Sequence, residues 1–195
     1  SDVSLTPKGT KFEMGGERFE TQLIGEFNVY NAAAALCVAF SQHISADAAR
    51  RALRSASAPP GRMELIQENP FQIFIDYSYE PKSLEEALKT IKFFRPRRII
   101  VLIGSAGGGR DRWRRPVMGE IADRFADIVV VTTDDPYGEN PETIIDEIMP
   151  GILKNKTRVF GENVFRVADR RTAIQKAIAL AEEGDVVLLS GKGGE

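Results

Sequence analysis

The chain has 195 residues, of which 43% are hydrophobic and 28% charged, and its net charge is −2. These values are typical of a globular protein, and they exclude a disordered tail and a nucleic-acid coat. The single cysteine, Cys37, excludes an intramolecular disulfide and a metal-thiolate cluster, and no apolar run reaches the ~18 residues of a membrane span. We therefore expect a cytoplasmic protein that binds neither membrane nor nucleic acid.

The first 58 residues predict a hairpin and two helices. The alternating runs "TKFEM" and "RFETQLIG" flank Gly15 and Gly16, a pair typical of a tight turn between strands. An alanine-rich helix is predicted over "NVYNAAAALCVAFSQ". A second follows over "ADAARRALRSA", where Ser45 can cap the first turn. The pattern ends at "SAPPGRMEL", whose two prolines and glycine at 59–61 predict a linker.

From residue 59 onward, apolar strands alternate with amphipathic helices. We expect strands in "FQIFID", "RRIIVLIG", "DIVVVTTD", "TRVF" and "DVVLLSG", and helices in "PKSLEEALKTIKFF", "RRPVMGEIADRFA", "PETIIDEIMPGIL" and "DRRTAIQKAIALAEE". Strands that are apolar on both faces are typical of a parallel sheet covered on both sides. The sequence therefore predicts an α/β domain with a Rossmann-like, mostly parallel sheet and helices on both faces.

Four unusual loops follow strands: "DYSYEP", "GSAGGGRDR", "TTDDPYGENP" and "SGKGGE". Ligands of such sheets bind beyond the carboxyl ends of the strands, so one surface should collect all four loops. The glycine loop matches neither the P-loop pattern nor G-x-G-x-x-G. Its arginines can bind phosphate or carboxylate bidentately, although a solvated arginine cluster before a helix is the plainer interpretation.

The acidic residues of these loops allow two interpretations each. Asp76 at a strand end can accept hydrogen bonds from a ribose or support Mg²⁺ through water, or it can cap the next helix. Asp134 and Asp135 can recognise an amine, or they can cap a loop and a helix. The ending "GKGGE" can bring a lysine and a glutamate to a strand end, or it can be a glycine-rich turn.

In their order along the chain, these pieces resemble the Mur ligases, and within that family the muramoyl-tripeptide synthetase branch. "GEFNVYNAAAA" resembles G-x-F-N-x-x-N at the end of the central ATPase domain, and "PGRMELI" resembles G-R-x-E at the junction with the C-terminal domain. "IDYSYEPKSLEEAL" resembles D-Y-A-H-T-P-x-x-L, and "GGGRDRWRRPVMG" resembles G-G-D-R-D-x-x-K-R-P-x-M-G. "TTDDPYGENP" resembles T-x-D-N-P-R-x-E-D-P, and "GDVVLLSGKGGE" resembles G-D-x-x-L-x-A-G-K-G-H-E.

The resemblance implies the tail of an α/β ATPase domain at residues 1–58 and a C-terminal ligase domain, truncated at its end, at residues 59–195. It implies that the whole enzyme uses ATP and Mg²⁺ to join a free amino acid to a UDP-N-acetylmuramoyl-peptide through an acyl phosphate, during peptidoglycan synthesis. We expect a monomeric enzyme. The P-loop is missing from these 195 residues, so the chain alone should be inactive.

The resemblance also implies residue roles. Arg110 would bind the carboxylate of the incoming amino acid, while Arg114 and Arg115 would lie where phosphate charge accumulates. No metal ligand is assigned. The remaining roles are ATP contacts at Asn28, Asn31, Arg62 and Asp76, and acceptor contacts at Asp134, Asp135, Tyr137, Gly191 and Glu195.

Several positions depart from the family pattern. Tyr79 and Gly194 replace histidines, and Gly109 replaces the aspartate before Arg110. Tyr137 stands where enzymes that add meso-diaminopimelate place an arginine for the second carboxylate. A neutral phenol cannot replace that charge, and a pocket bounded by Asp135 and Glu195 would favour a bare ammonium group. We therefore expect lysine or another diamino acid as the acceptor, or a smaller amino acid if Tyr137 simply fills the pocket.

Two alternatives stay open. The first is another amide ligase of the superfamily, such as a folylpolyglutamate or cyanophycin synthetase, although the arginine loop and the "GKGGE" ending argue against it. The second is a non-catalytic binding module that lacks the P-loop half, which Tyr79 and Gly194 favour.

Overall fold

The computed structural model describes residues 3–6, 8–109 and 111–193. The chain divides into two compact units, Ser1–Pro59 and Pro60–Glu195. The division falls between the two prolines of the predicted linker. None of the helices in the described part of the chain is long and apolar enough to cross a membrane.

The first unit is a small antiparallel sheet with two helices. Phe12 and Phe19 face each other across the predicted hairpin, which is confirmed, and they form a core with Leu36. Ser45 accepts a hydrogen bond from the amide of Ala48, as its predicted capping role requires. The elements are β1 (Ser4–Thr6), which was not expected, β2 (Gly9–Met14), β3 (Glu17–Thr21), α1 (Glu26–Ser41) and α2 (Ala46–Ser55).

The second unit is built on a six-stranded sheet in the order β4-β5-β9-β6-β7-β8. The strands β5 to β9 run parallel, and only the edge strand β4 pairs antiparallel with its neighbour. This arrangement confirms the predicted mostly parallel sheet. The strands are β4 (Glu64–Gln67), β5 (Gln72–Asp76), β6 (Ile99–Ile103), β7 (Ile128–Val131), β8 (Val164–Arg166) and β9 (Val186–Ser190).

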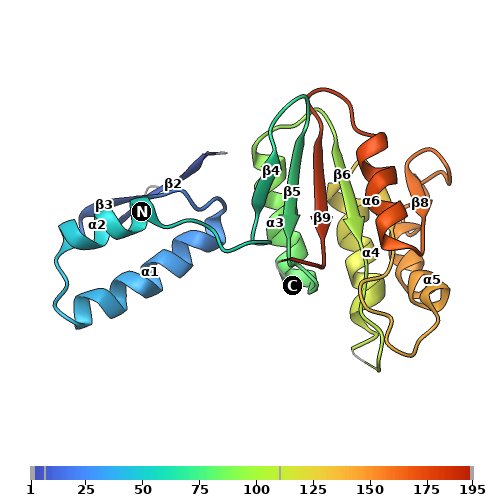
Figure 1. Cartoon of the computed structure of the whole chain (residues 1–195), viewed down its shortest axis with the longest axis horizontal. Helices are drawn as coiled ribbons and strands as arrows, with labels where there is room; N and C mark the ends of the chain where they lie inside the picture. The colour runs from blue at the N-terminus through green and yellow to red at the C-terminus, as the bar shows by residue number, and fades with distance from the viewer. Residues whose placement is uncertain (1–2, 7, 110, 194–195) are drawn as a thin grey trace. The chain divides into compact units, whose positions relative to one another are not determined.

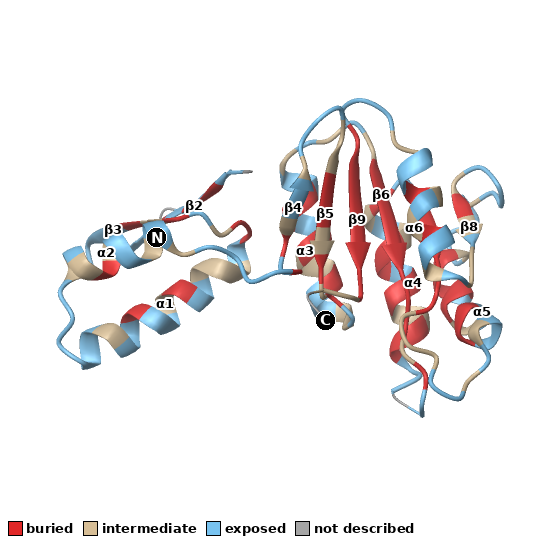
Figure 2. Cartoon of the chain, in the orientation of Figure 1, coloured by how far each residue is buried: buried red, intermediate tan, exposed pale blue. Residues whose placement is uncertain are grey.

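Helices cover both faces of this sheet, as predicted. α3 and α4 lie on one face with α5 beside α4, and α6 lies on the other (Figure 1). The central strands are therefore buried from both sides (Figure 2), and Ile100, Val101 and Leu188 have no exposed surface. The helices are α3 (Pro81–Phe93), α4 (Arg114–Phe125), α5 (Pro141–Ile152) and α6 (Arg170–Ala179).

One predicted strand lies elsewhere. We expected a strand at 157–160, but the edge strand is Val164–Arg166. The reason is Arg158, whose guanidinium is held by the carboxylate of Asp123 at 2.6 Å, so this segment crosses the end of α4. The chain then turns at Gly161, which has a φ of 83°, before it joins the sheet.

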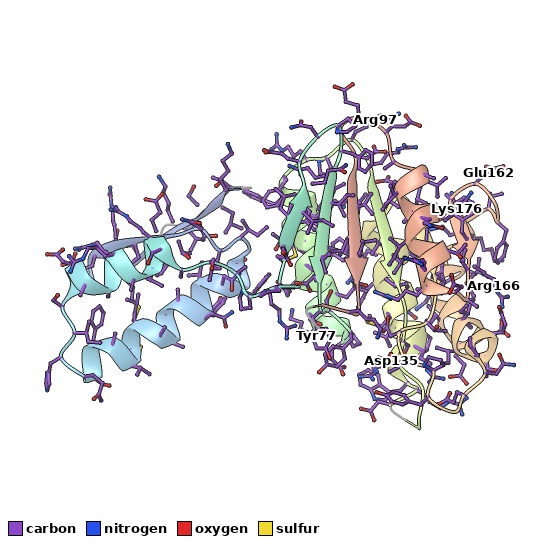
Figure 3. All side chains as sticks on the ribbon, in the orientation of Figure 1. Tyr77, Arg97, Asp135, Glu162, Arg166 and Lys176 are labelled. Atoms are coloured by element: carbon purple, nitrogen blue, oxygen red, sulfur yellow. The ribbon has the colours of Figure 1, made fainter. Side chains whose placement is uncertain are left out.

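The parallel strands bring the unusual loops to one edge. The arrowheads of β5, β9 and β6 point the same way in Figure 1, so the loops that follow them lie together at their carboxyl ends. Figure 3 shows Tyr77 and Asp135 at this edge and Arg97 at the opposite edge. The predicted collecting surface is therefore confirmed for the described parts of these loops.

Candidate functional site

Asp134 occupies the centre of this edge. Its side chain is only 5% exposed, and its Oδ1 accepts a hydrogen bond of 2.8 Å from Arg170. Its Oδ2 is buried and has no hydrogen-bond partner among the residues that the structure describes. Burial raises the pKa of Asp134 to about 6, although Arg170 acts to lower it. The carboxylate is therefore mostly ionised at neutral pH, and Arg170 is its hydrogen-bonded counter-charge.

Two glycines make room for this carboxylate. A Cβ added at Gly104, after β6, would clash with Asp134 Oδ1, and one added at Gly191, after β9, would lie 2.5 Å from the same atom. Gly191 also has a φ of 92°, which favours glycine. Asp134 is therefore packed between the ends of three neighbouring strands.

Arg170 completes this arrangement from the first turn of α6. Besides Asp134, it contacts the carbonyl of Ser190 at 2.7 Å, so it ties the end of β9 to the loop after β7. The sequence analysis did not assign Arg170 a role. No pattern distinguishes it from the neighbouring Arg171, because only the three-dimensional structure brings it to Asp134.

Asp135 and Lys192 come together from two of the predicted loops. Lys192 donates to Asp135 Oδ1 at 2.7 Å, and the side chain of Asp135 is about half exposed. The charge of Asp135 is therefore already balanced in part by the domain itself.

Tyr137 lies on the exposed part of the acidic loop. Its backbone has a φ of 52°, and 67% of the residue is exposed. A Cβ added at Gly108 would lie 3.3 Å from the tyrosine ring, so the ring lies directly over the arginine loop. An aromatic ring thus occupies the place where the family pattern has a cation.

Arg114 and Arg115, which are predicted to lie near phosphate, form ion pairs with carboxylates of the domain. Arg114 is 5% exposed, pairs with Glu80 and lies 5.7 Å from the ring centre of Tyr79. Arg115 has no exposed surface. A phosphate role for Arg115 would require this buried side chain to leave its ion pairs, and that role stays a prediction.

Two further predicted contacts, Arg110 and Glu195, lie outside the described residues, as does the departure at Gly194. Their chain neighbours are described. The amide of Gly109 donates to Glu139 Oε1 at 3.0 Å, immediately before Arg110.

The residues after the linker hold the end of β5. The amide of Met63 donates to Asp76 Oδ2 at 2.8 Å, and burial raises the pKa of Asp76 above its usual value. Arg62 is exposed, and its guanidinium lies 4.6 Å from the ring centre of Tyr77. Arg62 is therefore open to a ligand, whereas Asp76 is buried and its predicted ribose contact stays a prediction.

Asn28 and Asn31 lie together on α1 of the first unit. Asn31 donates to the side-chain oxygen of Asn28 at 3.0 Å, and Asn28 donates to the carbonyl of Ile24 at 2.8 Å. Their predicted nucleotide contacts are not tested by this arrangement. Within residues 3–6, 8–109 and 111–193, no three His, Cys, Asp or Glu side chains gather as a metal site needs.

Fold and site together define a three-layer α/β domain with buried and half-exposed charged residues at the carboxyl ends of its strands. Residues 61–193 match the family described as Mur ligase, glutamate ligase domain. The chain therefore belongs to the Mur ligase family. Enzymes of this family are ATP-dependent amide ligases.

The similarity to known proteins extends beyond the matched domain. Over 195 residues the chain is 41% identical to the UDP-N-acetylmuramoyl-L-alanyl-D-glutamate–2,6-diaminopimelate ligase of Aquifex aeolicus (strain VF5), covering 100% of this chain and 38% of that protein. A solved structure of an enzyme with that name is 32% identical, with a TM-score of 0.64 over 99% of this chain and 39% of the other. The chain thus spans well under half the length of these relatives.

A third neighbour bears on one of the alternatives. The folylpolyglutamate synthase of Mycobacterium tuberculosis, solved with ADP and AMPPCP, has a TM-score of 0.76 over 98% of this chain and 44% of that chain. Its sequence identity is 20%, so this likeness shows a shared fold alone.

Proposed function

We propose that this chain is the acceptor-binding part of an ATP-dependent ligase that adds an amino acid to UDP-N-acetylmuramoyl-L-alanyl-D-glutamate. Family membership and the 41% identity to an enzyme of that name support the reaction class. The observation that carries the acceptor site is Asp134. Its Oδ2 has no hydrogen-bond partner among the described residues and lies beside Gly191. The proposal requires the chain at Gly191 to open, so that a substrate ammonium group can donate to this oxygen.

The chemistry assigns binding and orientation to these residues. ATP, when bound, supplies the phosphoryl group that activates the donor carboxylate, which is otherwise a poor electrophile. We assign the carboxylate of the acceptor to Arg110 and the ammonium that does not react to Asp134. When the carboxylate and the ammonium of the acceptor are both bound, its other amine is directed at the activated carbon of the donor. Such positioning accelerates a bimolecular step.

For the acceptor, we propose lysine or another diamino acid with a single carboxylate. Tyr137 supports this preference, because a neutral ring offers no counter-charge to a second carboxylate. Asp135 contributes less than its charge suggests, since Lys192 already pairs with it. The names of the relatives include 2,6-diaminopimelate, which makes that compound the necessary competitor in any test.

For the nucleotide, we propose contacts at Asn28, Asn31 and Arg62. The exposed guanidinium of Arg62, stacked on Tyr77 next to the linker, supports this role. The same proposal includes Mg²⁺, as the ion that would accompany ATP. Since ATP and UDP-linked sugars are intracellular metabolites, we place the reaction in the cytoplasm.

A competition assay on the whole protein that contains this chain tests the proposal. The protein would receive ATP, UDP-N-acetylmuramoyl-L-alanyl-D-glutamate and equal concentrations of lysine, ornithine and meso-diaminopimelate, and the ligated products would be separated by mass. We expect ADP release that depends on both substrates and a lysine or ornithine product. A dominant diaminopimelate product would refute the acceptor preference alone. Absence of all turnover would favour the non-catalytic binding module. Extension of folylglutamate in a parallel reaction that contains this substrate, glutamate and ATP would favour the folate enzyme.

A further inference from the structure

Two loops of the site are joined by a buried ion pair whose members the proposed function leaves unused. The arginine loop, residues 104–113, follows β6, and the acidic loop, residues 132–140, follows β7. Arg115, at the start of α4, has no exposed surface. Its Nη1 donates to Glu139 Oε2 at 3.0 Å, and Glu139 lies in the acidic loop.

Each member of the pair also holds the backbone of the arginine loop. Arg115 Nη2 donates to the carbonyl of Ala106 at 3.0 Å, and Glu139 Oε1 accepts from the amide of Gly109 at 3.0 Å. A backbone hydrogen bond of 2.8 Å from Gly107 to the carbonyl of Asp135 joins the same two loops. The pair therefore holds the arginine loop through hydrogen bonds at Ala106 and Gly109, on either side of the Gly107 contact.

The charges favour a fixed geometry. Arg115 also donates to Glu147 on α5 at 2.7 Å, so two carboxylates hold one buried guanidinium. The pKa of Glu139 lies below its usual value, first because of the hydrogen bond from Arg115 and then because of the Gly109 amide. Charge-assisted hydrogen bonds of this kind are stronger and more directional than neutral ones.

We infer that Glu139 and Arg115 are positioning residues, which hold the arginine loop against the acidic loop and thereby set the place of the chain at Gly109, directly before Arg110. The inference rests on the proposed function, in which Arg110 and Asp134 bind opposite ends of the acceptor. An acceptor bound at both ends must then span the two loops, and the Glu139–Arg115 pair holds these loops together at Gly109. Neither residue touches the substrate in this account.

The test uses Glu139, which is partly exposed, because loss of the fully buried Arg115 would endanger folding. Glu139→Ala removes the hydrogen bond to the Gly109 amide and the ion pair with Arg115. Glu139→Gln keeps an oxygen for the Gly109 amide without the charge. Arg124→Gln is the matched control, because it removes an ion pair with Glu85 on the outer face of α4.

The first readout is amide hydrogen exchange at Gly107 and Gly109 in the 195-residue chain. We expect faster exchange in Glu139→Ala, partial restoration in Glu139→Gln and no change in Arg124→Gln. Unchanged exchange at Gly109 in Glu139→Ala would show that the pair does not hold the loop, and it would overturn the inference.

The second readout is kinetic and uses the whole protein. We expect Glu139→Ala to raise KM for the acceptor by about tenfold or more, because small misplacements of binding groups are costly, while KM for ATP stays within about twofold. Glu139→Gln should recover part of the loss. If exchange accelerates but acceptor KM does not change, or if both KM values rise together, the pair is only structural. An inactive wild-type protein would instead refute the proposed function. The exchange data would still test whether the Glu139–Arg115 pair holds the arginine loop.

Discussion

At the scale of single residues, the most unusual group is the buried carboxyl of Asp134. Its pKa of about 6 exceeds the usual 3.8, so between these values the native state holds a proton that the unfolded state has released. Stability contributed by this group is therefore highest below pH 3.8, falls as pH rises to about 6, and stays low above that. Arg170, Asp135, Lys192 and Arg114 are the charged groups that act on it.

Asp134→Asn removes this titration, so its stability relative to wild type should change with pH. The shift corresponds to about 3 kcal/mol at about 1.36 kcal/mol per pH unit, in favour of the variant as pH rises from about 3.5 to 7. Any constant effect of the lost contact with Arg170 cancels in this comparison. Urea unfolding followed by circular dichroism at several pH values measures the difference. A difference that did not vary with pH would show that Asp134 titrates normally.

Tyr137 sets the second prediction at this scale. In the whole protein, Tyr137→Arg should raise kcat/KM for meso-diaminopimelate relative to lysine by about tenfold, because a guanidinium adds a charge-assisted contact worth about 1.5–3 kcal/mol. Tyr137→Phe is the control, since it keeps the ring without adding charge. A ratio that moved equally in both variants would mean that ring size, rather than charge, determines the choice.

At the scale of elements, α4 and α5 approach each other through glycines. A Cβ added at Gly151 would clash with the carbonyl of Pro116, and one added at Gly119 would clash with the carbonyl of Ile148. This close packing matters for the site, because α4 begins at Arg114 and α5 follows the acidic loop. The packing of α4 against α5 therefore fixes the ends of the arginine loop and of the acidic loop.

We expect Gly151→Ala to lower the free energy of unfolding by about 1–3 kcal/mol through overpacking. An alanine without such a clash would stabilise the helix by up to about 1 kcal/mol, so the sign of the effect is decisive. Gly138→Ala is the control, because no atom lies near its added Cβ. Urea unfolding measures both variants, and a stabilised Gly151→Ala protein would contradict the described packing.

Much of this architecture can be predicted from the sequence, for identifiable reasons. The strands β5, β6, β7 and β9 contain continuous apolar runs, a strong signal for buried parallel strands, and glycine directly follows β6 and β9. The short edge strands carry weaker signals. No strand is predicted over β4, which follows the linker at 59–61. The strand predicted at 157–160 lies before β8, because Arg158 in "TRVF" is held by α4 rather than by the sheet.

Only part of the site could be predicted. The loops that form it could, because the carboxyl ends of parallel strands lie at one edge of the sheet. The partners of its arginines could not, because Arg115 and Glu139 come from different loops and no local pattern pairs them. The role of Arg170 could not be predicted either, because the folded sheet is what brings α6 next to Asp134.

At the scale of the whole molecule, the proposed acceptor site lies in a chain that has no P-loop sequence. It contains no G-x-x-x-x-G-K-[ST] segment, whose amides and lysine cradle nucleotide phosphates. We therefore expect the 195-residue chain to release no ADP above background when given ATP, the nucleotide-dipeptide and lysine. A coupled ADP assay measures this. Substrate-dependent turnover by the chain alone would contradict the assignment of its two units.

The central claim is that this domain binds the acceptor amino acid through the arginine loop and Asp134. Its most direct test is the pair of KM values for the acceptor and for ATP in the whole protein carrying Arg110→Ala. Loss of a charge-assisted carboxylate contact costs about 1.5–3 kcal/mol, so KM for the acceptor should rise by about 10- to 100-fold while KM for ATP stays nearly constant. Equal increases in the two values would contradict the claim, because Arg110 would then serve the phosphates or the fold.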